Sequence, residues 1–222
     1  MRISLLGGTG DIGEALALRW AFHSNHDILI GSRSPERARN KATEYETELD
    51  SRGVDRTING FVNEMAADRG DVIVVSVPAA HIKDTITEVR ERLDQDDIVI
   101  TPAVAMNQTD NGFQYEKPKD GSVTQIVSAT VPEGIPVIGA YHNLSADRLA
   151  NLDVELDLDT ILVGDDRDAK ETVKMLTEKI DGLRALDGGP LSNAAEVEAL
   201  TPLLINLAMH NKNMHDVGVK FH

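Results

Sequence analysis

The sequence predicts an α/β fold in which a Rossmann-type, doubly wound and mostly parallel sheet is followed by a small C-terminal α/β domain that ends in a long apolar helix. Three observations predict it. Short β-rich runs alternate with helical stretches, the pattern of a parallel sheet covered by helices. A glycine-rich turn at 8–13 separates the first strand-like run from the first helical stretch. The run 71–77 is almost wholly apolar, as in a strand buried on both faces.

The first elements follow from local patterns. Residues 2–7 predict a strand, and 10–22 predict a helix with apolar side chains on one face. Residues 27–31 predict the second strand. A charged helix begins at Pro35 and runs to about Asp50, with Ser34 as its N-cap and the proline in its first turn.

The later elements are less regular. Strands are predicted at 71–77, 97–101 and 136–141, and a helix at 82–93. The segment 109–121 is polar and contains glycine and proline, so we expect a surface loop there.

The pattern changes near residue 145, so we expect a Rossmann domain at 1–145 and a small C-terminal domain at 146–222. Strands are predicted at 160–163 and 183–186, with a helix at 169–180 between them. Residues 191–219 carry a helical pattern that is too apolar for an exposed helix. We therefore expect it to pack in a domain or subunit interface, and we predict a homodimer.

Composition excludes several classes of function. The 222-residue chain has a net charge of −15, which disfavours nucleic acid and anionic membranes as partners. It has no cysteine, so disulfides and cysteine-based sites are excluded and a reducing cytoplasm is expected. We see no membrane span, no secretory signal and no metal-ligand pattern. The acidic excess fits either an ordinary cytoplasmic protein or a halophilic one.

The glycine-rich turn is a candidate phosphate site. Gly8, Thr9, Gly10, Asp11, Ile12 and Gly13 form a G-x-G-x-x-G motif between a strand and a helix. We expect Gly8 to make the tight turn, Gly10 to let the backbone approach a pyrophosphate, and Gly13 to let the helix pack against the strand. The alternative is an ordinary strand–helix turn.

The end of the second strand indicates which dinucleotide binds. NAD-binding folds usually place an acid there for the ribose 2′-hydroxyl. This chain instead has Ser32 and Arg33, with Arg37 one helical turn later. A hydroxyl and two guanidinium groups suit the 2′-phosphate of NADP. A solvated basic turn is the alternative.

A second candidate segment ends the buried strand at the carboxyl edge of the sheet, where ligands bind in open α/β folds. It contains Ser76, Val77, Pro78 and His81. We expect its backbone to border the nicotinamide ribose. His81 either contacts the cofactor or faces solvent.

Several blocks together resemble one family, the F420-dependent NADP reductases of archaea and some bacteria. They are 5–10, 31–33, 150–153, 181–187 (Asp-Gly-Leu-Arg-Ala-Leu-Asp), 189–193 (Gly-Pro-Leu-Ser-Asn), 198–203 and 218–221, and they extend over almost the whole chain. The resemblance implies a Rossmann domain, a small C-terminal domain, a homodimer, and hydride exchange between NADP(H) and the deazaflavin coenzyme F420.

The resemblance also assigns site residues. It implies that NADP phosphates bind at Thr9–Ile12 and the 2′-phosphate at Ser32, Arg33 and Arg37. It places the deazaflavin near 140–143, where His142 is the candidate beside the reacting rings. We count Asn143 and Ala146 with the cofactor-binding positions of this segment. The sequence 143–145 is more polar than we associate with the family.

Two other functions stay open from the residues alone. One is another NADP-dependent dehydrogenase or imine reductase, for which Lys83 or Tyr141 would be the proton donor. The other is a non-catalytic NADP sensor that regulates a partner.

Overall fold

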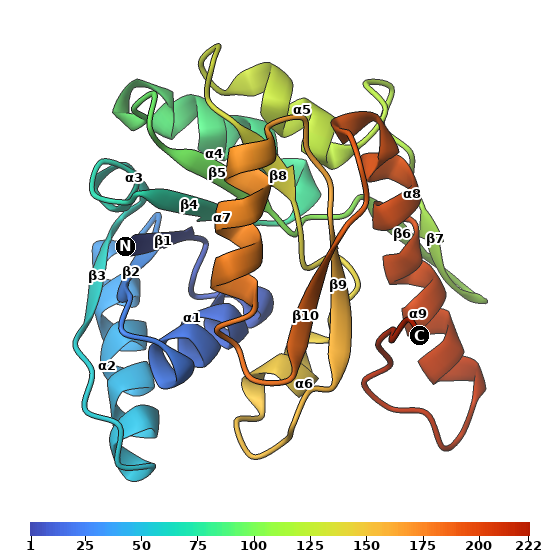
Figure 1. Ribbon diagram of the computed structural model, residues 1–222, viewed down its shortest axis with the longest axis horizontal. Helices are drawn as coiled ribbons and strands as arrows, with labels where there is room; N and C mark the ends of the chain where they lie inside the picture. Colours follow the sequence, from blue (N-terminus) through green and yellow to red (C-terminus); the bar gives the residue numbers. More distant parts are fainter.

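The computed structural model describes residues 1–222, and its centre is a six-stranded parallel sheet with the strand order β3-β2-β1-β4-β5-β8 (Figure 1). This is the order of a dinucleotide-binding Rossmann fold, and the chain reverses direction across the sheet between β1 and β4. The strands are β1 (Arg2–Leu6), β2 (Asp27–Ser32), β3 (Ile58–Val62), β4 (Val72–Val75), β5 (Ile98–Thr101) and β8 (Val137–Gly139).

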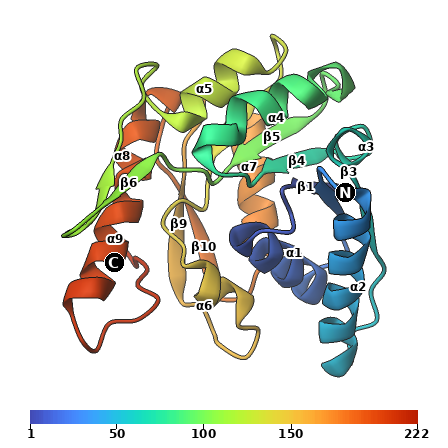
Figure 2. The ribbon, with the colours of Figure 1, turned by 180° about the vertical axis from the view of Figure 1, so that it is seen from behind.

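Helices cover both faces of the sheet (Figures 1 and 2). One face is covered by α1 (Asp11–His23), α2 (Pro35–Ser51) and α7 (Arg167–Thr177), and the other by α3 (Asn63–Ala67), α4 (Ile82–Val89) and α5 (Val123–Thr130). Alternate residues of each strand enter opposite cores. Ile3 and Leu5 of β1 belong to a cluster of 33 buried residues, whereas Leu6 belongs to one of 15. Short 3₁₀ turns lie at Ala79–His81, Arg90–Arg92 and Leu191–Asn193.

The C-terminal part adds a parallel pair of strands, β9 (Leu158–Leu162) and β10 (Leu183–Asp187), which α7 connects. An antiparallel bridge between Gly139 and Val163 joins this pair to the main sheet. The helices α6 (Ala146–Ala150), α8 (Ala194–Glu198) and α9 (Leu200–His210) complete the chain. None of the helices is both long and apolar enough to cross a lipid bilayer.

The expected surface loop at 109–121 is wrong in part, because the chain forms a hairpin of β6 (Met106–Thr109) and β7 (Gly112–Tyr115). Its strands are only four residues long. β6 is exposed along its whole length and shows no apolar alternation, and β7 shows it only at Phe113 and Tyr115, which is too short a pattern to predict a strand. Asn206 of α9 holds the hairpin by bonding both the N–H and the carbonyl of Phe113, at 2.7 Å each. The tertiary contact with α9 therefore stabilises this hairpin.

The apolar pattern at 191–219 is not one continuous helix. It consists of a 3₁₀ turn, α8 and α9, and residues 211–219 are not helical. Pro202 lacks the N–H that would bond the carbonyl of Glu198, where α8 ends. The sequence also did not predict β3, α3, α5 or α6, which are short elements.

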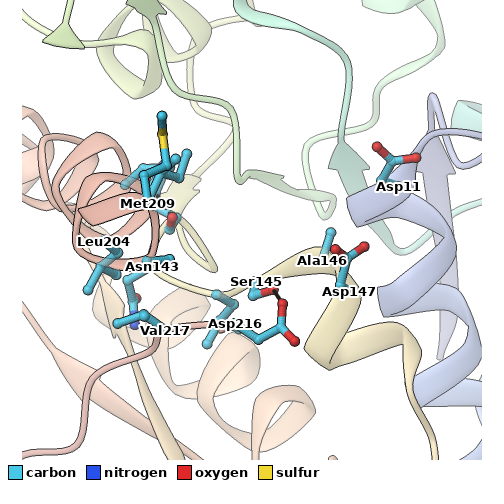
Figure 3. A pocket seen from close by; sticks show the side chains of 14 residues that line it. Asp11, Asn143, Ser145, Ala146, Asp147, Leu204, Met209, Asp216 and Val217 are labelled. Atoms are coloured by element: carbon cyan, nitrogen blue, oxygen red, sulfur yellow. Dashed lines mark hydrogen bonds between the residues drawn. The ribbon is translucent and has the colours of Figure 1, made fainter. Parts of the chain in front are cut away.

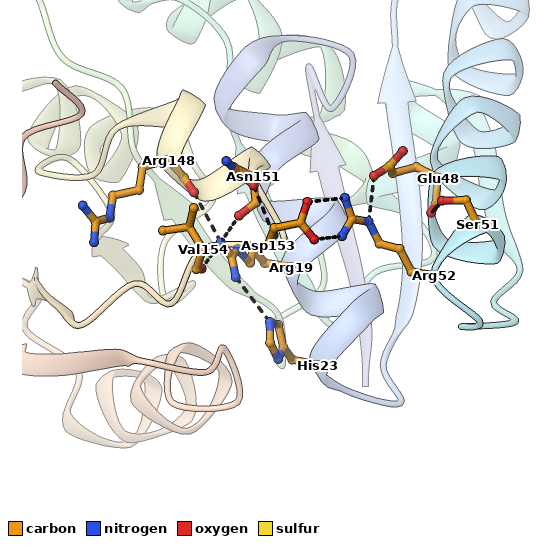
Figure 4. Close-up of polar contacts among 9 residues, drawn as sticks. All are labelled: Arg19, His23, Glu48, Ser51, Arg52, Arg148, Asn151, Asp153 and Val154. Carbon is orange, nitrogen blue, oxygen red and sulfur yellow. Dashed lines mark hydrogen bonds and ion pairs between the residues drawn. The ribbon is translucent and has the colours of Figure 1, made fainter.

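A buried arginine fastens α1 to the C-terminal half of the chain (Figure 4). Arg19 is 1% exposed and donates to the carbonyl oxygens of Arg148, Leu149, Asn151 and Val154 at 2.6–3.3 Å. The next residue, Trp20, donates to the carbonyl of Leu176 in α7 at 3.0 Å. The larger core extends over both sides of residue 145, so the proposed domains share one core.

Replacement of Arg19 tests this connection. Arg19→Met keeps much of the side-chain volume but leaves four carbonyl oxygens without their donor. We expect it to lower the free energy of unfolding by about 3 kcal/mol.

Urea denaturation measures the change, with Arg92→Ala as the control. Arg92 is exposed and its ion pair with Asp68 is 3.7 Å long, so its loss should change stability by less than about 0.5 kcal/mol. Equal effects of the two substitutions would contradict the role given to Arg19.

Candidate functional site

Three adjoining cavities lie along the carboxyl edge of the parallel sheet. Cavity A, of about 670 Å³, lies between the turn after β1, the end of β2 and the start of α4. Cavity B, of about 480 Å³, lies beside the switch point and shares Gly10 and 76–78 with cavity A. Cavity C, of about 550 Å³, shares His142 and Thr201 with cavity B. Together they form one groove from the tip of β2 to α9.

The turn at 7–13 forms the wall between β1 and α1. Gly7 has φ +77°, and a β-carbon there would lie 2.6 Å from Val77. The tight turn therefore requires Gly7 as well as Gly8, where a β-carbon would lie 2.8 Å from the Leu5 carbonyl oxygen. A β-carbon at Gly13 would lie 2.7 Å from the Oγ of Ser76, so the close packing predicted for Gly13 is present.

The first turn of α1 contains backbone N–H groups without a hydrogen-bond acceptor. Gly10, its N-cap residue, supplies no side-chain cap, so the N–H groups of the first turn have no acceptor within the helix. A β-carbon at Gly10 would meet only the Gly7 carbonyl, at 3.5 Å. The space over Gly10 therefore belongs to the groove, beside Thr9, Asp11 and Ile12. Such a helix start binds anions.

The cations that the sequence singled out border cavity A. Ser32, Arg33 and Arg37 all line it, and Arg37 reaches back to the Thr9 carbonyl at 3.4 Å. Ser34 accepts from the N–H of Arg37 at 3.3 Å, which is the predicted N-cap of α2. The opposite side of cavity A carries carboxylates, from Asp84 and Glu88 of α4.

The segment after β4 lies where cavities A and B meet. Ser76, Val77 and Pro78 line both cavities, and the Oγ of Ser76 donates to the carbonyl of Leu6 at 3.0 Å. His81 is exposed and borders cavity A only. Cavity B is mainly apolar, so it suits a flat ring better than a phosphate.

A strained turn after β8 places His142 between cavities B and C. Tyr141 has φ +66°, which is uncommon for a residue with a side chain. Its N–H donates to Thr160 at 3.1 Å, and its hydroxyl shares a hydrogen bond with Thr177 at 2.9 Å. The next residue, His142, receives a hydrogen bond from Thr201 at its carbonyl, at 2.6 Å.

The His142 ring is the most unusual feature of the groove. It is 2% exposed, and neither ring nitrogen has a hydrogen-bond partner. Burial lowers the pKa of His142 to about 3, so the ring is neutral near pH 7. A neutral imidazole has one donor and one acceptor, and both are available beside cavities B and C.

Cavity C is lined by α9, the start of α6 and the C-terminal segment (Figure 3). Asn143 and Ala146 border it, together with the carboxylates of Asp11, Asp147 and Asp216. The amide of Asn143 already bonds the Asp159 carbonyl at 2.7 Å and Thr160 at 3.3 Å. The Asn143 amide therefore supports the turn through these hydrogen bonds, and the residue contributes only van der Waals surface to cavity C.

All of the predicted site residues line the groove or the turn behind it, although the sequence separates them by more than 100 positions. The sequence alone did not indicate Gly7, Thr201 and Asn63 as site residues, although they line the groove or shape it. The glycine pair at 7–8 could have indicated Gly7. Nothing local marks Thr201 or Asn63. No three histidine or acidic side chains gather as a metal site.

Comparison with known proteins identifies the family. Residues 2–105 match the family model described as NADP oxidoreductase, coenzyme F420-dependent. An F420-dependent NADP reductase of Methanocaldococcus jannaschii is 38% identical over 96% of this chain and 95% of its own. That of Methanothermobacter thermautotrophicus is 35% identical over 99% and 94%.

Solved structures support the fold. A candidate F420-dependent NADP reductase from Arthrobacter sp. FB24 matches with a TM-score of 0.82 at 20% identity, over 100% of this chain and 99% of its own. A pyrroline-5-carboxylate reductase from Coxiella burnetii has a TM-score of 0.61 at 16% identity, over 94% and 67%.

The depressed pKa of His142 predicts a pH effect on stability. The unfolded chain binds a proton at this residue below about pH 6.5, whereas the folded chain does so only below about pH 3. Stability is therefore lost as the pH falls through this window. Between pH 6 and pH 4 the wild-type free energy of unfolding should fall by about 2 kcal/mol more than that of His142→Leu.

Urea denaturation at both pH values measures this difference. His215→Leu removes an exposed histidine and should keep the wild-type dependence. Parallel curves for wild type and His142→Leu would show that the ring titrates normally in the folded chain.

Proposed function

The chain belongs to the F420-dependent NADP reductase family, and we propose that it catalyses reversible hydride transfer between NADP(H) and the deazaflavin coenzyme F420. The observation that carries the proposal is the continuity of the groove. Cavity A is bordered by a turn suited to a pyrophosphate and by a pair of arginines, and it adjoins the apolar cavity B. Cavity B in turn lies beside His142, whose buried ring nitrogens have no hydrogen-bond partner.

The residues present fit NADP. The uncapped start of α1 offers N–H groups at Asp11 and Ile12 to the pyrophosphate, and Gly10 leaves the space open. Ser32, Arg33 and Arg37 would hold the 2′-phosphate through a hydroxyl and two cations. We place the nicotinamide end along 76–78, at the entrance of cavity B.

We place the deazaflavin ring in cavity B and the adjoining part of cavity C, beside His142 and Ala146. The ring nitrogens of His142 would each gain a partner from a carbonyl or an N–H of the deazaflavin. Three carboxylates line cavity C, so the anionic tail of F420 would lie outside it, in solvent.

When bound, the two coenzymes supply the hydride donor and the hydride acceptor. The chain contributes orientation, proximity and the exclusion of water. The apolar walls of cavity B would hold the two rings against each other and exclude water from them. Because the His142 ring is neutral near pH 7, it would orient the deazaflavin by hydrogen bonding and would not deliver a proton by titrating there.

We also propose a homodimer that forms through α9. Leu203 and Leu207 lie one helical turn apart on the same face of α9 and remain 53% and 37% exposed. An apolar helix face of this kind favours burial against a second copy. The acidic surface and the lack of cysteine support a place in the cytoplasm, and the charge also fits a halophilic source.

A direct assay tests the proposed reaction. Anaerobic mixing of the chain with NADPH and F420 should consume both in equal amounts, and the reverse mixture should restore them. Binding of NADPH without turnover would favour a sensor. NADPH oxidation by a carbonyl or imine, but not by F420, would favour another dehydrogenase.

The choice of NADP over NAD depends on Arg33. Arg33→Ala removes a charged donor to the 2′-phosphate, so NADPH binding should weaken by about 1.5–3 kcal/mol, while NADH binding should barely change. Arg39→Ala, which removes an exposed arginine of α2 that does not line cavity A, is the control. Equal losses for both cofactors in calorimetric titration would remove Arg33 from the 2′-phosphate site.

A charged substitution in α9 tests the proposed dimer. Leu207→Glu should turn a dimer into a monomer at micromolar concentration in light scattering, because a carboxylate would be buried in the interface. Met175→Glu changes an equally apolar residue of α7 that is 57% exposed, and it should leave the dimer intact. A wild-type monomer with full activity would rule out the proposed assembly.

A further inference from the structure

Among the side chains that line cavity A, Asn63 is the one with a solvent-inaccessible polar atom that has no hydrogen-bond partner. It is the first residue of α3 and is 2% exposed, and its Oδ1 accepts no hydrogen bond. A buried acceptor without a donor costs free energy in the unliganded protein. A side chain of this kind that lines a cavity marks a position where a ligand can supply the missing donor.

The sheet register shows which part of the cavity Asn63 faces. Val62 of β3 pairs with Ser32 of β2, so Asn63 follows at the same edge and at the level of Arg33. The amide also lies against the strand tip, because a β-carbon added to Gly31 would be 3.0 Å from its Oδ1. Asn63 therefore belongs beside Ser32 and Arg33, which we assign to the 2′-phosphate.

The chemistry of the strand tip leaves a role for an acceptor here. In NAD-binding folds an acid at the end of the second strand accepts from the adenosine ribose. This chain has Gly31, Ser32 and Arg33 there, and an arginine cannot accept. The adenosine half of NADP has donors in the ribose 3′-hydroxyl and the 6-amino group of adenine, whereas its phosphate and ring nitrogens only accept.

We propose that Asn63 is an adenosine-binding residue whose Oδ1 accepts a hydrogen bond from the ribose 3′-hydroxyl or the adenine 6-amino group of NADP. The inference rests on the proposed function. It adds the end of β3 to the cofactor site, beside the end of β2. It makes β3, the edge strand of the sheet, part of the binding surface.

Calorimetric titration with adenosine 2′,5′-bisphosphate and with inosine 2′,5′-bisphosphate tests the inference on the full chain. Asn63→Leu keeps the side-chain volume and removes the acceptor, so adenosine 2′,5′-bisphosphate should bind about five- to tenfold more weakly. The thermal midpoint of the free variant should stay unchanged or rise, because the substitution removes a buried group without a partner. Asn40→Leu, an exposed position on α2, should change neither.

The two ligands identify the donor. If wild type prefers adenosine over inosine and the variant loses that preference, the donor is the 6-amino group. If wild type binds both ligands alike and the variant weakens both equally, the donor is the 3′-hydroxyl. Where Asn63→Leu does not fold, Asn63→Ala replaces it with the same expectations for the binding of the two ligands, and the thermal midpoint is then not compared because the truncation leaves a cavity.

Two results would overturn the inference. One is unchanged binding by the variant. The other is weaker binding accompanied by a clear drop in the thermal midpoint, which would make Asn63 a structural residue. If wild type binds neither bisphosphate nor NADP, the proposed function fails and this inference fails with it, whereas a binding wild type with an unaffected variant overturns the inference alone.

Discussion

The whole groove depends on the hydrogen bonds between Arg19 of α1 and four backbone carbonyls of the segment around α6. The first turn of α1 carries the free N–H groups of the phosphate site, and the second half of the same helix carries Arg19 and Trp20. Through these side chains α1 is held to the segment around α6 and to α7. The phosphate site and the wall that contains His142 are thereby fixed to one rigid helix, and their separation does not depend on a flexible linker.

The same groove also contains features that cost stability. Tyr141 adopts a left-handed backbone conformation, and the His142 ring and the Asn63 amide oxygen are buried without partners. Each costs stability and each borders a cavity. Structural bonds compensate nearby, through Thr160, Thr177 and Thr201 around the turn. Strain and unpaired polar atoms persist when the surrounding structure holds them in place, and they are common at sites that await a ligand.

Much of the fold and part of the site could be predicted from the sequence. The strand–turn–helix context identified the phosphate turn, and the absence of an acid after β2 indicated Ser32, Arg33 and Arg37 as its neighbours. Residues that act through local backbone geometry leave such patterns. The hairpin 106–115, the break between α8 and α9 at Ala199 and the position of Asn63 were not predictable in this way. The hairpin depends on Asn206, more than 90 residues away, and Asn63 enters the groove only through the register of β3 with β2.

We propose that this groove brings two ring systems into direct contact, so that a hydride moves between them without entering solvent. The most direct test uses NADPH that carries deuterium at the transferred C4 position, together with F420 in ordinary water. Direct transfer should place the label at C5 of the reduced deazaflavin in a one-to-one ratio with the NADP⁺ formed. Deuterium recovered in the solvent, or NADPH oxidised without reduction of F420, would contradict it.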